Sequence, residues 1–150
     1  MQSIVGHEAV VSVTVQGGRG PAERRLLTPW GERPMPARAG SLPWPGSLPA
    51  PAPATVYREP RQAMVVGAEG QTIGVTGRGL VTGEPARFRA DPEQAWQPVA
   101  SWAGPWPVDD QWWDEAAARR LARFQVVGVD GSAFLMIVEG GQWWVEAEYD

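Results

Sequence analysis

The stretch LARFQVVGVDGSAFLMIVEGGQWWVEAEY, residues 121–149, decides the fold of this chain. Its composition is that of strands, because β-branched and aromatic residues fill three runs. The runs span residues 121–129, 132–139 and 142–149. Asp130-Gly131 and Gly140-Gly141 separate them, and such pairs are typical of two-residue type I′ hairpin turns. The sequence therefore predicts a three-stranded antiparallel meander here.

Two tight turns would also fix which residues face each other across the meander. The expected pairs are Val129–Ser132, Val127–Phe134, Gln125–Met136, Arg123–Val138, Val138–Trp143, Met136–Val145 and Phe134–Ala147. This face is apolar enough to be the core side. The opposite face is also apolar over part of its length, with Phe124, Val126, Leu135, Ile137 and Trp144. A sheet that is apolar on both faces needs a cover on both, which a helix, the rest of the chain or a partner protein could supply.

The remaining sequence divides into three parts. Residues 1–28 form an N-terminal segment in which residues 9–15 alternate as a half-buried strand does. Residues 29–61 hold nine Pro among 33 residues, which predicts an extended, semi-rigid tether. Residues 62–150 make up a small β domain. The expected class is mainly β (α+β), with a small antiparallel sheet or partly open barrel and one short helix.

Further elements of the β domain follow from shorter patterns. Short strands are expected at residues 63–66, 72–76, 86–90 and 96–103. The prolines of Gly104–Pro107 lack ladder donors and argue against an interior strand there. Residues 111–120 carry the strongest helix pattern, with Asp109-Asp110 available as a cap.

The composition excludes several kinds of chemistry. The 150 residues include no Cys, one His (His7), and 13 basic residues that are all Arg. A zinc cage, a disulfide framework, a phosphate-loop lysine and a Schiff base are therefore ruled out. Residues 1–61 carry a net charge of +3, from seven Arg and four Glu, and residues 62–150 carry −7, from six Arg and thirteen acids. We expect no cofactor, no metal and no catalytic activity.

Three small constellations have a functional and a structural interpretation. Asp109, Asp110 and Asp114 could hold Mg²⁺, but helix capping is the preferred interpretation. The glycines of Gly17–Gly20 and Gly77–Gly79 could approach a phosphate, yet tight turns explain both loops better. Arg19, Arg24 and Arg25 are similarly better explained as a solvated segment than as an anion site.

Tryptophan is the informative residue type, because seven of the nine lie in the last 55 residues. Some must be core, but interfaces and base-stacking surfaces also favour Trp. The residues proposed to bind a partner are Trp102, Trp106, Trp112, Trp113, Arg119, Arg120 and Arg123. The alternative is a small barrel that stacks single-stranded DNA, which the acidic charge of this half makes less favourable.

The run Trp102-Ala-Gly-Pro-Trp-Pro-Val-Asp-Asp-Gln-Trp-Trp-Asp114 and the ending Trp143–Asp150 resemble the C-terminal region of the actinobacterial ImuB family. Gly6–Val10, Gly17–Arg24 and Pro43–Pro49 extend the similarity over nearly the whole chain. ImuB proteins are catalytically inactive Y-family DNA polymerase homologues of the damage-inducible mutasome. The family's polymerase-like core and sliding-clamp peptide are not represented in this sequence.

The resemblance implies a role in translesion synthesis and DNA repair during the SOS response. It names an accessory RecA-like protein and an error-prone replicative-type polymerase as partners, and it implies an adaptor domain without an active site. We expect a cytoplasmic protein, associated with the nucleoid during DNA damage, because the longest apolar run, Ala133–Val138, is far shorter than a membrane span.

Overall fold

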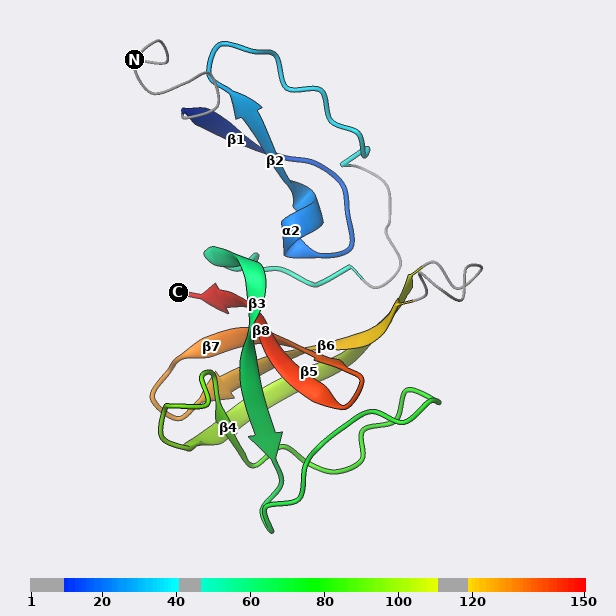
Figure 1. Ribbon diagram of the computed structural model, residues 1–150, viewed down its shortest axis with the longest axis vertical. Coiled ribbons are helices and arrows are strands. Elements are labelled where there is room, and N and C mark those ends of the chain that lie inside the picture. The colour runs from blue at the N-terminus through cyan, green and yellow to red at the C-terminus, as the bar shows by residue number, and fades with distance from the viewer. Residues whose placement is uncertain (1–9, 41–46, 111–118) are drawn as a thin grey trace. The chain divides into compact units, whose positions relative to one another are not determined.

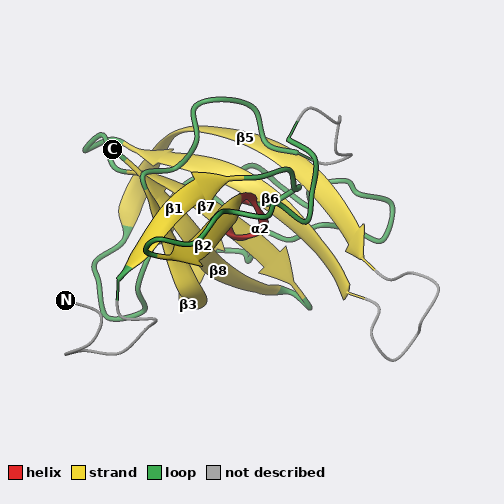
Figure 2. Ribbon diagram, turned by 90° about the horizontal axis from the view of Figure 1, so that it is seen from above, coloured by secondary structure: helices red, strands yellow, loops and turns green. Residues whose placement is uncertain are grey.

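Figure 1 shows the computed structural model of the chain, which describes residues 10–40, 47–110 and 119–150, without the side chains of residues 109, 110 and 119. The chain divides into two compact units, residues 1–49 and 50–150. Strands make up most of the described ribbon in Figure 2, so the expected mainly β class is confirmed. In the described ranges, no helix has the length and apolar character needed to cross a membrane.

The first unit is a two-stranded antiparallel hairpin with a helical turn in its connection. Its elements are β1 (Val11–Val15), α2 (Pro21–Arg24) and β2 (Arg25–Pro29). Glu23 Oε2 accepts hydrogen bonds from the backbone N–H groups of Arg19, at 2.8 Å, and Gly20, at 3.4 Å. Because these amides open α2, the carboxylate acts as a helix cap. The loop Gly17–Gly20 is thus organised around a carboxylate of the chain itself, in line with the preferred structural interpretation.

The predicted Pro-rich tether is anchored at both ends. Near its start, the backbone N–H of Ala37 donates to Gln16 Oε1 at 3.1 Å, and Arg38 O accepts from Gly17 N–H at 3.1 Å. At its other end, residues 55–61 belong to the strand Thr55–Val66, in which Thr55, Val56 and Arg61 pair with β8. The tether prediction is therefore wrong for residues 55–61, where Thr, Val and Tyr supply strand-forming side chains.

The second unit is a curled antiparallel sheet of six strands. They are β3 (Thr55–Val66), β4 (Arg87–Arg89), β5 (Gln97–Asp110), β6 (Arg119–Gly128), β7 (Ala133–Glu139) and β8 (Gln142–Tyr149). Each strand pairs with the next in chain order, and β8 pairs back with β3, so the pairings form a ring. The ring is thin at β4, which contributes three residue pairs to β3 and two to β5. The expectation of a small antiparallel sheet or partly open barrel is confirmed.

Apolar side chains fill the inside of this barrel. The buried members are Ala63, Val65, Ile73, Phe88, Ala122, Phe124, Val126, Met136, Val138, Trp143 and Val145. The ring of Phe124 is fully buried, with its centroid 4.9 Å from that of Trp143 and 6.1 Å from that of Trp102. Trp143 Nε1 donates a 2.6 Å hydrogen bond to Ile73 O, so the one polar atom of this buried side chain is satisfied.

The other face of the same strands carries a second apolar cluster. Of the residues expected there, the cluster contains Ile137 and Trp144, whereas Phe124 and Val126 belong to the core. Val108, Leu121 and Ile137 are buried there, and the half-buried Trp144 packs against them. Leu121 and Ile137 are chain neighbours of core-facing residues, so strand alternation places them outside. Trp144 therefore provides part of the cover that the outer face needs.

The register of the first hairpin differs from the prediction by one residue. The observed pairs include Val127–Ala133, Val126–Phe134, Phe124–Met136 and Arg123–Ile137. The turn has three loop residues, because Gly131 N–H donates to Gly128 O and Gly128 N–H donates to Ser132 O. Gly131, at φ +88°, takes the left-handed position that such a loop requires. The one-residue slip reverses the faces of β6, so Phe124 and Val126 point into the core instead of Gln125 and Val127.

The second hairpin follows the predicted register near its turn. Gly140 and Gly141 both have positive φ, as a type I′ turn demands, and the pairs Val138–Trp143 and Met136–Val145 are present. The predicted pair Phe134–Ala147 is wrong, because Ala147 pairs with Leu135. Glu146 is the extra residue of the bulge that causes this shift.

Two further expectations around β5 need correction. β5 continues through Gly104–Pro107, with a bulge between Ala103 and Trp106. Among the described residues, β5 beyond Val99 pairs with β6 alone, so prolines that lack an N–H are tolerated on the side away from β6. In the predicted helix at 111–120, residues 119 and 120 belong to β6, and residues 111–118 lie outside the described part. The described helix is α2 instead.

The long β3–β4 connection holds less strand than predicted. Residues 72–76 form two isolated bridges, Val66–Thr72 and Val75–Val81, and not a regular strand. Gly79 N–H donates to Thr76 O at 2.9 Å, so Gly77–Gly79 is a tight turn. This is the interpretation that the sequence favours. Of the strand expected at residues 86–90, Arg87–Arg89 forms a regular strand.

Candidate interaction surfaces

The β1–β2 hairpin exposes an apolar face. Val13 lies opposite Leu27 and Val11 opposite Pro29, so their side chains share one side of the two-stranded sheet. The exposed fractions are 63% for Val13, 73% for Val15 and 49% for Leu27. The neighbouring Trp30 is 64% exposed. We call Val11, Val13, Val15 and Leu27 the hairpin face. The sequence predicted this strand, but the opposite side, with Ser12 and Thr14, is the more covered one.

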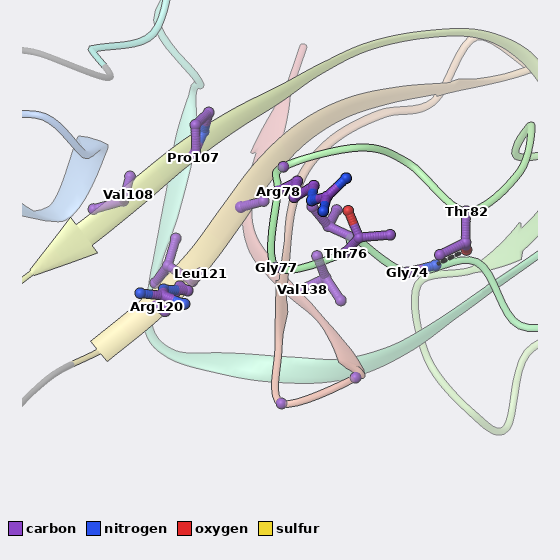
Figure 3. A pocket seen from close by; sticks show the side chains of 15 residues that line it. Gly74, Thr76, Gly77, Arg78, Thr82, Pro107, Val108, Arg120, Leu121 and Val138 are labelled. Atoms are coloured by element: carbon purple, nitrogen blue, oxygen red, sulfur yellow. Dashed lines mark hydrogen bonds between the residues drawn. The ribbon is translucent and has the colours of Figure 1, made fainter.

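A pocket of about 660 Å³ opens in the second unit (Figure 3). Its walls come from the loop 74–82, the adjoining ends of β5 and β6, and the β7–β8 turn. Pro107, Ala122 and Val138 supply apolar surface, and Arg78 and Arg120 supply the charged side chains. We call this the arginine pocket. Because all of its walls belong to one unit, its shape does not depend on how the two units are placed.

The charge of the arginine pocket is opposite to that of the unit around it. Arg78 and Arg120 are both exposed at the surface. Among the described residues that line the pocket, none is acidic. Residues 50–150 contain eight Arg against fourteen Asp and Glu, a formal charge of −6. The described charged side chains of the pocket lining are thus basic, whereas the unit as a whole is acidic.

The predicted tryptophans take different positions. Trp102 is half-buried and packs against the core beside Phe124. Trp106 is also half-buried and lies on β5 opposite Arg123, after the bulge. Trp112 and Trp113 lie outside the described residues. The structure therefore assigns Trp102 a packing role and keeps Trp106 as a hypothesis for partner contact.

The three arginines proposed to bind a partner also differ in their positions. Arg120 is exposed and lines the arginine pocket. Arg119 opens β6, and its side chain is not described. Arg123 is only 7% exposed: its Nε donates to Glu146 Oε2 at 2.8 Å and its Nη2 to Glu146 Oε1 at 3.1 Å. A guanidinium held in a buried bidentate pair is not offered to a partner, so partner binding by Arg123 does not fit its position.

An arginine–tryptophan cluster on the second unit was not singled out from the sequence. The guanidinium carbon of Arg89 lies 4.4 Å from the ring centroid of Trp96, and that of Arg87 lies 6.0 Å away. Arg89 Nη1 also donates to Pro92 O at 2.8 Å, which fixes its position. The strand β4 with its alternating Arg-Phe-Arg was the available signal, since Phe88 points inward and both Arg point outward.

Among the described residues, three groups have shifted pKa values. Burial raises the pKa of Tyr57, and its O–H donates to Glu148 Oε2 at 2.6 Å. Burial also raises the pKa of Tyr149. Hydrogen bonds from the Ser132 hydroxyl and N–H lower the pKa of Asp130. Each shift moves the group further from neutrality, so none of the three is tuned as a general acid or base near pH 7.

In the described part of the chain, no group of three or more His, Cys, Asp or Glu is placed to hold a metal ion. Of the acids considered for Mg²⁺, Asp114 and the side chains of Asp109 and Asp110 lie outside that part. Comparison with protein-family models, curated proteins and solved structures finds no match to this chain.

Proposed function

We propose that this chain is a non-catalytic protein-interaction module, an adaptor of an ImuB-like translesion synthesis factor. Its partners would be the accessory RecA-like protein and the error-prone polymerase that the resemblance names. It would act in the cytoplasm, with the nucleoid during DNA damage. The residues that carry the resemblance are spread over both units, so both units belong to the proposed module.

The hairpin face is the observation that supports this proposal most directly. A two-stranded sheet is marginal alone in water, and here its exposed side is the apolar one. Contiguous exposed apolar residues are typical of protein-binding sites. Among the described residues β1 and β2 pair only with each other, so their outer edges offer backbone groups to an added strand.

A binding experiment tests the proposal. The full chain is immobilised and its affinity for each candidate partner is compared between the original protein and Val13→Thr/Leu27→Thr. Threonine keeps the strand propensity while removing apolar surface, so we expect at least tenfold weaker binding.

The matched control is Val129→Thr, because Val129 in the β6–β7 turn is also 63% exposed but lies outside the hairpin face. It should bind as the original protein does. If neither partner binds the original protein, the proposed function is wrong. If the double variant remains folded and binds unchanged, the hairpin face is the wrong surface.

Single-stranded DNA binding is the second candidate, and the arginine–tryptophan cluster favours it. Arg87 and Arg89 could contact phosphates while Trp96 stacks on a base. Quenching of Trp fluorescence by an oligonucleotide, weakened by salt and reduced in Trp96→Leu, would support it. An absence of quenching at low salt would eliminate it. The net charge of −6 on residues 50–150 makes this the less favoured function.

A further inference from the structure

We infer that the arginine pocket binds a short acidic peptide segment of a partner protein. The carboxylates of the segment would pair with Arg78 and Arg120, and one of its apolar side chains would contact Pro107, Ala122 and Val138, which lie side by side on adjacent strands. This inference rests on the proposed adaptor function, but it uses a surface in a different unit from the hairpin face.

The size and walls of the pocket fit such a segment. A volume of about 660 Å³ lies within the range of ligand-binding pockets and exceeds what one side chain fills. Ala122 and Val138, which pair across β6 and β7, are only 4% and 5% exposed, so the apolar floor is recessed. A recessed apolar floor stabilises an inserted aliphatic or aromatic side chain by removing it from water.

The rim is organised by hydrogen bonds within the loop 74–82. Thr76 N–H donates to Leu80 O at 2.8 Å, and Gly74 N–H donates to Thr82 Oγ1 at 2.9 Å, a bond drawn in Figure 3. A third bond runs from Thr82 N–H to Gly74 O at 3.0 Å. These bonds hold the Arg78 turn in place, so less conformational entropy is lost on binding.

Four glycines leave room for the backbone of a bound peptide. Gly77 and Gly79 lie in the loop and Gly140 and Gly141 in the β7–β8 turn, and all four line the pocket. A Cβ atom placed on any of them would meet no atom within 4 Å. The pocket walls are therefore open at the positions where a peptide main chain would pass.

Charge selects an acidic peptide over a nucleic acid. Arg78, on the loop, and Arg120, on β6, approach the pocket from separate elements, as Figure 3 shows. Two guanidinium groups match two carboxylates by charge. The many phosphates of a polynucleotide would be repelled by the net charge of −6 on this unit. A short acidic segment would contact only the part of the surface around Arg78 and Arg120.

The first experiment is a peptide selection that assumes no particular peptide sequence. Random twelve-residue peptides displayed on phage are selected against the immobilised full chain. We expect the enriched peptides to combine two or more Asp or Glu with Leu, Ile or Phe. Absence of enrichment, or enrichment of basic or purely polar peptides, would overturn the inference.

A selected peptide, labelled with fluorescein, is then measured by fluorescence anisotropy. Arg78→Gln and Arg120→Gln should each weaken its binding about tenfold, as one lost charge-assisted pair implies, and 0.5 M NaCl should do the same. Val138→Phe, which fills the floor, should abolish it. The control Arg58→Gln removes an exposed Arg of β3 that does not line the pocket and should leave binding unchanged.

The variants also separate this inference from the adaptor function. Val13→Thr/Leu27→Thr should lose partner binding yet keep the peptide affinity. If the partners bind but Arg78→Gln and Arg120→Gln, folded by circular dichroism, retain full peptide affinity, the pocket inference is wrong and the adaptor proposal stands. Equal competition by a single-stranded oligonucleotide would also overturn the inference.

Discussion

The buried pair Arg123–Glu146 makes the most quantitative prediction for this chain. The two residues are 7% and 9% exposed and share two hydrogen bonds, at 2.8 and 3.1 Å. In Glu146→Leu the guanidinium stays buried without its carboxylate, and its Nη1 has no hydrogen-bond partner among the described residues. Removing one member of a buried pair typically costs about 3–5 kcal/mol of folding free energy.

Urea unfolding of the full chain, followed by Trp fluorescence, measures this loss. With a urea dependence of about 1.5 kcal/mol/M, the midpoint should fall by about 2–3 M. The control Arg58→Met changes an exposed Arg and should stay within about 0.5 kcal/mol of the original protein.

The double variant Arg123→Met/Glu146→Leu keeps the prediction testable if the single variant does not fold. Both charges are then gone, so no uncompensated buried charge remains, and stability should return to within about 1–2 kcal/mol of the original protein. A loss below about 1 kcal/mol in Glu146→Leu would refute the reasoning and would restore Arg123 as a candidate for partner contact.

Three further variants test the fold. Trp143→Phe leaves Ile73 O without its donor and opens space beside the core, so it should cost about 2–3 kcal/mol in urea unfolding; an unchanged midpoint would contradict this. Gly131→Ala, at φ +88°, should cost about 1–2 kcal/mol by the same measurement, and a neutral result would refute the three-residue turn. Asp130→Asn keeps the oxygen that accepts from Ser132 but removes the charge. Because the folded pKa of Asp130 lies below the ordinary 3.8, its contribution is present above about pH 4 and lost as pH falls, so the two thermal midpoints should converge below pH 4; a gap constant from pH 7 to pH 3 would contradict this.

Much of the fold follows from the sequence because strand composition and turn residues are local signals. The C-terminal meander and the type I′ turn at Gly140-Gly141 are both predictable from such patterns. Which face of β6 points into the core is not predictable from such local patterns. Asp130-Gly131 fits a two-residue or a three-residue loop, and only the packing of Phe124 inside the barrel decides between them.

Other features depend on pairing across long sequence separations. β5 continues through Pro105 and Pro107 because a bulge and an open edge accept them, and neither is visible in the local sequence. The contact between Arg123 and Glu146 requires the bulge in β8, so Arg123 could not be removed from the list of exposed cations beforehand. Arg78 and Arg120 line the same pocket although they are about forty residues apart in the sequence, which no local pattern predicts.

Hydrogen–deuterium exchange on the full chain, with and without a bound partner, tests the adaptor account most directly. The account predicts that partner binding slows exchange of the backbone amides of Val11–Val15 and Arg25–Leu27, which include the edges of the hairpin face. Exchange in the β6–β7 turn around Val129 should not change. Protection confined to other segments, or no protection at a saturating partner concentration, would contradict the account.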